Sequence, residues 1–337
     1  THARSQAEMA AIGREFVARA VARGVAEETA QAIFATIAGY ASYGFCEAHA
    51  AAFATTAYKT AYLLCHHPAH YLAALLSLQP MGFYPPWVLV GEARRRGVQV
   101  LPPDVNKSAA QYTVEGGAVR VGLKQIKGVD EKVLKELLAA RSNRPYTSLA
   151  DLKERSGLSA DLRERFILSG ACSAFGSNRR ALLWEDKLGR KGAAVADFSQ
   201  TDKILLEWDI LGFSPSGHPL SCLRPRFREQ GIRSICDVLR LSRGREVQVA
   251  GLPIRPHRPP TRSGRTVAFF SLEDETGILD VTVFEDVYRR DGQMLFSGTP
   301  GPLLVQGHVE RRGAGVSVTA ARIQALTKIT PGTAYQE

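Results

Sequence analysis

The spacing of apolar residues divides the chain into a helical part and a β-rich part, with the change near residue 245. Before that point, apolar residues recur at helical spacing. This pattern predicts helices at residues 5–23, 27–41, 48–67, 69–78 and 86–96. Gly24 and Gly97 fit the ends of two helices, and Pro68 must break or kink the helix that it enters. The first hundred residues are therefore expected to be almost entirely helical.

The middle of the chain predicts shorter elements. Residues 98–108, VQVLPPDVNKS, contain two prolines and are expected to be extended. Residues 112–123, YTVEGGAVRVGL, alternate apolar and polar side chains around Gly116-Gly117, which is typical of a β-hairpin with a two-residue turn. Four more helices are predicted at residues 130–141, 148–156, 160–169 and 178–187. Residues 201–241 contain the turn-rich GFSPSGHPL and are expected to connect two domains.

From Glu246 onward the hydrophobic period changes to two. Five strands are predicted, at EVQVAGL, TVAFFSLED, GILDVTVFE, PLLVQGHVE and GVSVTAARI. A short helical segment at residues 286–291 falls between the third strand and the fourth. This layout matches the small OB barrel, a common nucleic-acid-binding fold. The predicted fold class is multidomain α+β, with helical hairpins followed by a five-stranded OB-type β-barrel.

Positive charge is concentrated in two regions of the chain. The 337 residues hold 43 Lys and Arg against 33 Asp and Glu, a net charge of +10. Residues 106–190 hold 16 basic residues against 10 acidic ones, and residues 215–265 hold 11 against 3. A basic excess of this kind favours a polyanionic partner, most often nucleic acid.

Cysteine and metal patterns narrow the class of protein. The five cysteines are scattered without a CxxC pair, which fits reduced thiols in a cytoplasmic protein. No apolar run approaches the ~20 residues of a membrane helix, so no membrane partner is expected. CHHPAH, residues 65–70, offers possible zinc ligands, but Pro68 disrupts their helical spacing and no second ligand pair follows. No metal site is therefore expected in the chain.

The first candidate DNA contact is GLKQIKGVDEKVLKELLAAR, residues 122–141. We expect a turn at Gly128 and a new helix from Asp130, and backbone N–H groups at such a helix start can bind phosphate. Lys124, Lys127 and Lys132 flank the turn. Asp130 would cap the helix but bring a carboxylate near the phosphate. The alternative is a simple αα corner with solvated lysines, and the sequence favours neither.

A second hairpin is predicted in LRERFILSGACSAFGSNRRALL, residues 162–183. Gly170 and Gly176 bracket its turn, and Asn178 is placed to cap the next helix. Arg179 and Arg180 then fall in the first helical turn, where cations oppose the helix dipole and call for a nearby anion such as a DNA phosphate. Two surface arginines without a DNA role are the alternative.

The third candidate is the loop between the first two predicted barrel strands, PIRPHRPPTRSGRT. It carries four arginines with few competing acids, and in OB folds this loop helps to hold single strands: Arg255, Arg258, Arg262 and Arg265. Phe269 and Phe270 lie on alternate faces of the second strand, so one of them could offer a base-stacking surface. Packing inside the barrel remains the simpler interpretation of the two rings.

The stretch YGFCEAHAAAFATTAYKTAYLLCHHP, residues 43–68, predicts a helix with several faces. Its alanines form a small-residue stripe that would permit close helix packing. His49 and Phe53 share one face, and Tyr58 and Tyr62 share another. By itself this pattern is typical of a packed helix with a polar rim.

Several stretches resemble one known family. YGFCEAHAAAFATTAYKTAYLLCHHPAHYLAALL, EARRRGVQVLPPDVNKS and VRVGLKQIKGV resemble the bacterial family C DNA polymerases, the alpha subunit of DNA polymerase III. QPMGFYPP, EWDILGFSPSGHPL and FFSLEDETGILDVTVF look more like the error-prone paralogue of that subunit, used in damage-induced synthesis. The match follows nearly the whole chain in order.

The resemblance implies a domain order. It gives a fingers segment at 1–105, tandem helix-hairpin-helix motifs at 106–190, a connection at 191–244, an OB domain at 245–327 and a tail at 328–337. The family usually has a serine before the histidine of the fingers, where Ala48 stands here. Carried over to this chain, the resemblance makes four residues candidates for the nucleotide-facing surface: Tyr43, His49, Tyr58 and Lys59.

The resemblance also implies what lies outside the chain. The family's catalytic aspartates lie upstream of the fingers and bind two Mg²⁺ ions in the complete polymerase. This sequence contains no Asp-x-Asp pair and begins at Thr1 without an initiator Met. We therefore expect the C-terminal part of a longer polymerase, with no catalytic residue of its own and no activity alone.

The implied partners are those of a polymerase at a damaged template. They are primer–template duplex DNA, single-stranded template, an incoming dNTP, a sliding clamp and damage-response accessory proteins, all at the nucleoid in the cytoplasm. A replicative alpha subunit is the alternative within the same class. A non-enzymatic single-stranded DNA-binding protein is an alternative of another class, although such a protein has no need of residues 1–105. Charge does not separate a DNA-binding barrel from an RNA-binding one.

Overall fold

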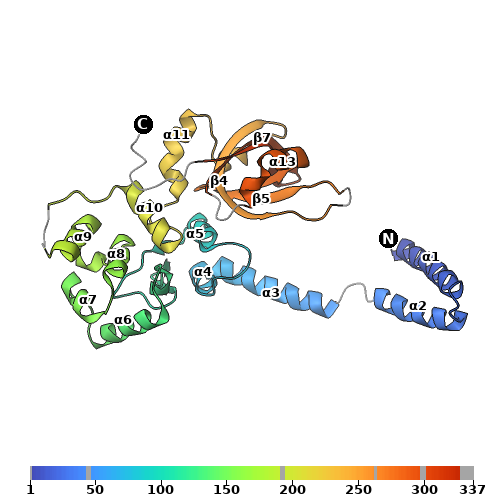
Figure 1. Ribbon diagram of the computed structural model, residues 1–337, viewed down its shortest axis with the longest axis horizontal. Helices are drawn as coiled ribbons and strands as arrows, with labels where there is room; N and C mark the ends of the chain where they lie inside the picture. The colour runs from blue at the N-terminus through green and yellow to red at the C-terminus, as the bar shows by residue number, and fades with distance from the viewer. Residues whose placement is uncertain (1, 43–46, 190–193, 262–263, 297–300, 327–337) are drawn as a thin grey trace. The chain divides into compact units, whose positions relative to one another are not determined.

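The computed structural model describes residues 2–42, 47–189, 194–261, 264–296 and 301–326. Contacts within the chain divide it into two units, Thr1–Tyr62 and Leu63–Glu337. The predicted domain border at residue 105 therefore falls inside the second unit (Figure 1).

The first unit is built on a pair of helices, α1 (His2–Val21) and α2 (Glu27–Ser42). Gly24 between them has a φ of 86°, a left-handed conformation that suits glycine and ends α1. The rings of Phe16 and Phe34 meet with their centroids 5.7 Å apart. Gly13 lies directly against the Phe34 ring, where a Cβ would overlap ring atoms. The predicted helices and the turn at Gly24 are confirmed.

Helix α3 (Glu47–His66) is where the sequence predicts it, but its side chains are not packed as its alanine stripe suggested. Ala54, Ala57 and Ala61 are exposed. Phe53 is 63% exposed and Tyr58 is 72% exposed. The helix thus presents most of its described side chains to solvent.

The second unit contains a mixed helical core followed by a β-barrel. Its first helices are α4 (Pro68–Ser77) and α5 (Pro86–Arg95). A small sheet follows, with β1 (Val100–Leu101) parallel to β3 (Ala118–Arg120), and β3 antiparallel to β2 (Thr113–Glu115). Gly116 and Gly117 both have positive φ in the β2–β3 turn, as a primed two-residue hairpin requires, so the predicted hairpin is confirmed.

The helical hairpins follow the sheet. Their elements are η1 (Leu123–Gln125), α6 (Glu131–Asn143), α7 (Leu149–Arg155), α8 (Ala160–Leu168), η2 (Ser173–Phe175), α9 (Arg179–Leu188) and α10 (Gln200–Leu211). The predicted caps are confirmed, because the side chain of Asp130 accepts from Val133 N–H and that of Asn178 accepts from Ala181 N–H.

One apolar core runs from α4 to the end of α10. Leu72 of α4 and Val90 of α5 belong to it, together with Val119 of the sheet, Phe166 of α8 and Leu211 of α10. Residues that the sequence assigned to three successive domains therefore bury their apolar side chains together.

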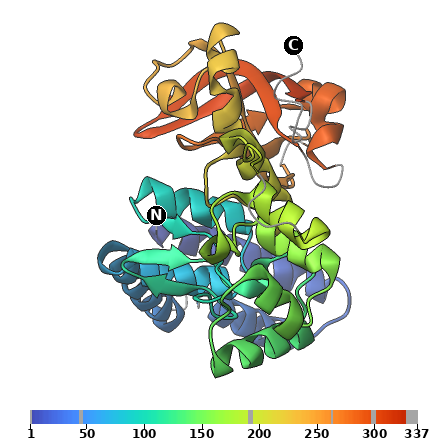
Figure 2. The same cartoon turned by 90° about the vertical axis from the view of Figure 1, so that its left-hand side faces the viewer.

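The barrel closes in the order β4-β5-β6-β8-β7. It is the orange and red part of the chain in Figures 1 and 2. Its elements are β4 (Glu246–His257), β5 (Ala268–Glu273), β6 (Ile278–Val283), α13 (Glu285–Asp291), η4 (Gly292–Leu295), β7 (Leu303–Arg312) and β8 (Gly315–Ala325). Strands β6 and β8 pair in parallel and close the sheet, and the other neighbours are antiparallel. The predicted five-stranded barrel and its helix are confirmed.

The region expected to be a turn-rich connection contains helices that the sequence analysis missed. Besides α10, it holds η3 (Pro219–Leu223), α11 (Arg224–Glu229) and α12 (Ile235–Val238). Helix α10 begins with a capping box between Ser199 and Asp202. Ile235 and Val238 are fully buried in the barrel core. In the described part of the chain, no helix has the length and apolar character needed to cross a membrane.

Candidate nucleic-acid interface

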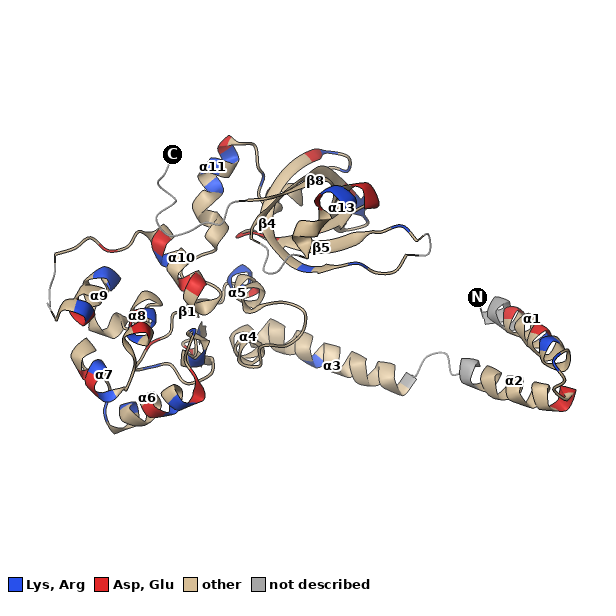
Figure 3. Ribbon diagram, in the orientation of Figure 1, with Lys and Arg blue, Asp and Glu red and all other residues tan. Residues whose placement is uncertain are grey.

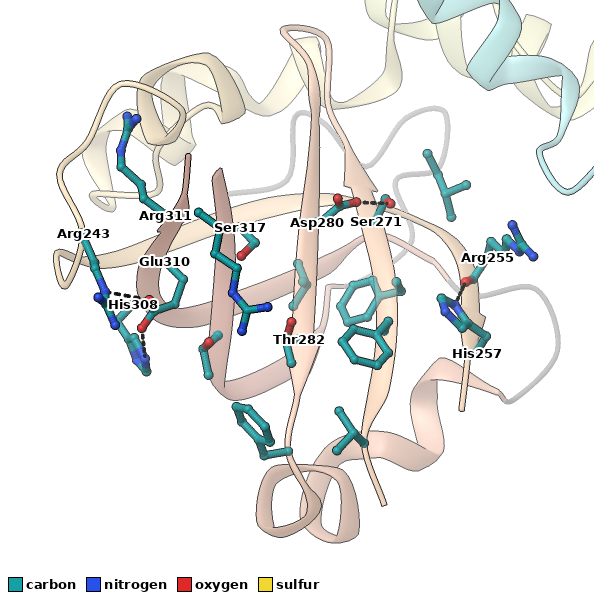
Figure 4. A pocket seen from close by; sticks show the side chains of 18 of the residues that line it. Arg243, Arg255, His257, Ser271, Asp280, Thr282, His308, Glu310, Arg311 and Ser317 are labelled. Carbon is teal, nitrogen blue, oxygen red and sulfur yellow. Dashed lines mark hydrogen bonds and ion pairs between the residues drawn. The ribbon is translucent and has the colours of Figure 1, made fainter. Parts of the chain in front are cut away.

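A groove of about 1080 Å³ runs across the outer face of the barrel (Figure 4). Strands β5 and β6 form its floor, and residues of β4, β7 and β8 line its sides. Its lining includes exposed rings, hydroxyls and cations, among them His257, Phe269, Thr282, Phe284, His308, Arg243, Arg255, Arg311 and Arg312. This is the face of the barrel on which OB folds hold single strands.

Aromatic rings give the groove its stacking surfaces. Phe269 is 36% exposed, whereas its neighbour Phe270 is 3% exposed in the barrel core, because successive strand residues point to opposite faces. The His257 ring lies beside Phe269 with centroids 5.7 Å apart. Phe284, at the end of β6, is 53% exposed. Exposed rings of this kind bind bases by stacking, whatever the base.

The cations of the groove differ in how far they are already paired. Arg243 forms an ion pair with Glu310 at 2.9 Å. Arg311 donates to the carbonyls of Leu239 and Leu241 at 2.9 Å each. Among the described residues, no carboxylate pairs with Arg255 or Arg312. These two exposed guanidinium groups can therefore meet phosphates without breaking an ion pair.

The other arginines of the predicted loop lie in different surroundings. Arg258 donates to the Tyr288 hydroxyl at 2.8 Å and lies over the ring of Phe296 at 5.0 Å. Arg265 is exposed, and its carbonyl accepts from the Thr261 hydroxyl. Arg262 lies outside the described residues. Of the four loop arginines, the structure places Arg255 in the groove with Phe269.

The lysines of the first hairpin lie at the surface, but backbone groups at its turn already form hydrogen bonds within the chain. Lys124, Lys127 and Lys132 are exposed. Gly128 has a φ of 91°, so the predicted turn is confirmed. The Lys127 N–H donates to the carbonyl of Ile210 at 3.1 Å, and Arg165 donates to the Lys127 carbonyl at 2.7 Å. DNA contact at this turn stays a prediction, and the exposed lysines are the observation that supports it.

Acidic residues accompany the basic ones on these helices, which carry both colours in Figure 3. Lys124 is 3.7 Å from the Glu131 carboxylate, and Lys187 pairs with Glu164 at 2.9 Å. Two of the exposed lysines on the helical hairpins therefore already have a carboxylate of this chain beside them.

The second hairpin turns its candidate residues inward. Gly170 is buried with a φ of 87°, and a Cβ there would lie 2.8 Å from the Arg179 guanidinium. Arg179 pairs with buried Glu207 at 2.6 Å and donates to the Leu168 carbonyl. In the structure, the anion beside Arg179 is therefore a carboxylate of this chain, and DNA contact at Gly170 and Arg179 stays a prediction. Arg180 stacks on Phe198, 4.6 Å from its centroid.

The fingers candidates lie on α3 where the structure describes them. His49 meets the ring of Phe53 edge-on with centroids 4.5 Å apart. Tyr58 and Lys59 are both exposed. Tyr43 lies outside the described residues. The role of these four residues beside a nucleotide stays a prediction.

The carboxylates of the described residues do not form a metal centre. No group of three or more His, Cys, Asp or Glu gathers in the described ranges to hold an ion. The acidic cluster at the end of β5 is used by ion pairs, with Arg224 donating to Asp274 at 2.9 Å and to Glu275. These residues do not fit a catalytic Mg²⁺ pair.

Comparison with known proteins gives the same two modules. Residues 97–182 match a family model described as a helix-hairpin-helix motif, and residues 242–326 match an OB-fold nucleic acid binding domain. The error-prone DNA polymerase of Symbiobacterium thermophilum is 42% identical over 389 residues. The chain is a relative of the error-prone DNA polymerases. Those of Anaeromyxobacter dehalogenans strain 2CP-C and Bdellovibrio bacteriovorus are 36% and 34% identical.

The match covers nearly all of this chain but only part of each error-prone polymerase. It takes in 97%, 97% and 90% of the chain, and 36%, 31% and 32% of the three relatives in the order given. The chain therefore spans about a third of the length of the curated relatives that it matches.

Sequence reasoning missed part of the groove. Phe284, His308 and Arg312 were not among the candidates, although they line it. The signal was present in the strand period, because Val305 and Val309 face the core while His308 and Arg312 fall on the other side of β7. To place these residues in the groove from that pattern, one must also know that β7 pairs with β8, and this pairing is seen only in the closed barrel.

Proposed function

We propose that this chain is the DNA-holding C-terminal part of an error-prone DNA polymerase, a nucleotidyltransferase of DNA repair and translesion synthesis. The barrel groove binds the single-stranded template, and the lysines of the first hairpin contact the backbone of the primer–template duplex. The observation that carries the proposal is the groove, in which exposed Phe269 and Phe284 lie with Arg255 and Arg312. Rings for bases beside cations for phosphates are what a sequence-independent single-strand site requires.

The complete polymerase supplies the rest of the activity. Template-directed nucleotidyl transfer takes place outside this chain, at an Mg²⁺ site that the described residues do not form. Helix α3 presents His49, Tyr58 and Lys59 toward the incoming dNTP. The proposed protein partners are a sliding clamp and damage-response proteins. The proposed location is the nucleoid in the cytoplasm. It rests on the match with error-prone polymerases over nearly the whole chain.

Fluorescence anisotropy of this chain with a labelled single-stranded DNA oligomer over a salt series tests the groove. Phe269→Ala is expected to weaken binding by about 1–3 kcal/mol, because a base loses its stacking partner. Arg312→Ala is expected to weaken binding and to flatten the salt dependence. Arg228→Ala, which removes an exposed arginine of α11 outside the groove, is the matched control. Equal losses from Arg312→Ala and Arg228→Ala would refute the groove as the binding site.

An RNA oligomer of the same sequence in the same titration separates the two nucleic acids. Tighter binding of RNA than of DNA would replace the polymerase assignment of the barrel with RNA binding. The fingers proposal has its own test in the complete enzyme, where His49→Ala is expected to slow nucleotide incorporation. Unchanged incorporation kinetics would remove His49 from the nucleotide-facing surface.

A further inference from the structure

The loop between α4 and α5 exposes an unusual amount of apolar surface. Leu78 is 68% exposed, Met81 is 36%, Phe83 is 67% and Tyr84 is 39%. These residues belong to the stretch LQPMGFY, which is part of neither the helical hairpins nor the lining of the barrel groove. Isolated apolar residues at a surface need no explanation, but four in one short loop indicate a binding surface.

Arg255 joins this loop to the barrel groove. Its φ of 48° is left-handed, a conformation that a non-glycine residue adopts at an energetic cost. The pairing of β4 with β5 shifts register between Ile254 and His257, so Arg255 sits in a β-bulge. Bulges re-aim side chains beside functional sites. Here the guanidinium lies over the Phe83 ring, 3.7 Å from its centroid.

The contacts continue from Phe83 into the groove. Nδ1 of His257 lies 3.2 Å from the carbonyl oxygen of Arg255. The His257 ring in turn neighbours Phe269, with centroids 5.7 Å apart. Arg255 and His257 both line the groove, and Figure 4 shows them on one side of it. Phe83 is therefore linked to Phe269 through the side chain and backbone of Arg255 and the ring of His257.

We propose that Phe83 and Arg255 form a stacking platform outside the barrel for the next bases of the single strand held in the groove. Phe83 offers its ring to a base, and Arg255 meets the phosphate beside that base. A contact that only fastened the loop to the barrel would bury the ring, whereas Phe83 stays 67% exposed. The proposal rests on the proposed function, because it extends a strand that the groove already binds.

Binding of oligo-dT of increasing length tests the platform, from about 4 to about 16 nucleotides, the range that single OB folds cover. The chain is expected to bind short oligomers through the groove and to gain affinity once an oligomer reaches Phe83. Phe83→Ala is expected to remove that gain, about fivefold or more, and to leave short oligomers unaffected. Phe83→Trp, which keeps an aromatic face, is expected to preserve it. Trp184→Ala, which removes a 46% exposed ring from α9, is the matched control.

The outcomes separate the platform from the groove. If Phe269→Ala weakens all lengths while Phe83→Ala weakens none, the platform is refuted and the groove stands. If Phe83→Ala lowers the affinity equally at all lengths and also lowers the melting temperature, the contact between Phe83 and Arg255 only stabilises the fold. This result would also refute the platform. Failure of the unmodified chain to bind any oligomer would refute the proposed function itself.

Discussion

Glu273 at the end of β5 allows a sharp test of how the barrel is joined to the helical core. The side chain is fully buried, and its Oε1 accepts from Arg95 Nη1 at 3.0 Å. Its Oε2 has no hydrogen-bond partner among the described residues. The carboxylate also lies directly against Gly91 of α5. Burial raises the pKa of Glu273 from 4.5 to about 7, and the ion pair with Arg95 only partly opposes this rise.

The raised pKa of Glu273 determines the sign and the size of its effect on folding stability as the pH changes. Below about pH 4.5, Glu273 is protonated in the folded and the unfolded chain. As pH rises toward 7, the unfolded chain ionises first, so folding stability is lost until the folded carboxyl ionises as well. At about 1.4 kcal/mol per pH unit, the loss reaches about 3 kcal/mol above pH 7 and is under about 1 kcal/mol at pH 5.

Glu273→Gln keeps an acceptor for Arg95 and removes the ionisation. The stability of the variant relative to the unmodified chain is expected to rise by about 2–3 kcal/mol as the pH goes from about 5 to about 8. Urea unfolding at several pH values measures this difference, followed by tryptophan fluorescence, because Trp87 and Trp208 pack together with ring centroids 5.7 Å apart. Glu136→Gln, on the exposed face of α6, is the control and should show no such trend.

The comparison must be made between variants at each pH. Buried His218 has a pKa lowered from 6.5 to about 4, so protonation of the unfolded chain removes stability as pH falls through this range. This loss opposes the Glu273 effect in the unmodified chain, and the difference between Glu273→Gln and the parent isolates the carboxyl. A constant difference between about pH 5 and about pH 8 would show that Glu273 is ionised throughout, and would refute the reasoning.

Four further changes give distinct outcomes. Arg224→Met should cost about 3–5 kcal/mol in urea unfolding, because it leaves two carboxylates at the barrel without their cation. Gly91→Ala should lower the melting temperature by the equivalent of about 1–3 kcal/mol, because its methyl group would overlap the Glu273 carboxylate. His218→Asn should gain about 2 kcal/mol over the parent at pH 5 but little at pH 7.5. Arg312→Ala should reduce the slope of log affinity against log salt for single-stranded DNA by about 0.7.

Matched variants separate these effects from general damage. Arg228→Met removes an exposed arginine from the same helix as Arg224 and should be nearly neutral. Gly39→Ala replaces a glycine within α2 and should stabilise this helix by about 0.5–1 kcal/mol. Losses in these controls as large as those in Arg224→Met or Gly91→Ala would contradict the assignments. An unchanged salt slope in Arg312→Ala would remove that residue from the phosphate contacts.

The sequence predicted those elements that local patterns determine. The strands of the barrel follow from an alternation of apolar residues, which also places Phe269 and Phe270 on opposite faces of the second strand. The β2–β3 turn follows from Gly116-Gly117, and the start of α6 follows from Asp130. In each case, residues close in the chain carry the whole signal.

Features that depend on distant partners were missed or misread. Arg179 in the first turn of α9 suggested an external anion, but its partner Glu207 lies 28 residues away on α10. Arg255 was recognised only as one of several loop arginines. Its left-handed backbone and its contact with Phe83 arise from the bulge and from the packing of the barrel, and no local sequence pattern predicts them.

The apolar core shared by α4, α5, the small sheet and α10 limits how this region can be exchanged between polymerases. A junction at residue 105 would set Leu72 and Val90 of one protein against Phe166 and Leu211 of another, and at a well-packed core such mismatches cost stability. A junction near His218 would instead keep Leu220 and Phe227 with Ala250 of β4, and Ile235 and Val238 with the core of the barrel. Natural or engineered chimaeras are therefore expected to carry the barrel as one interchangeable piece and residues 69–213 as another.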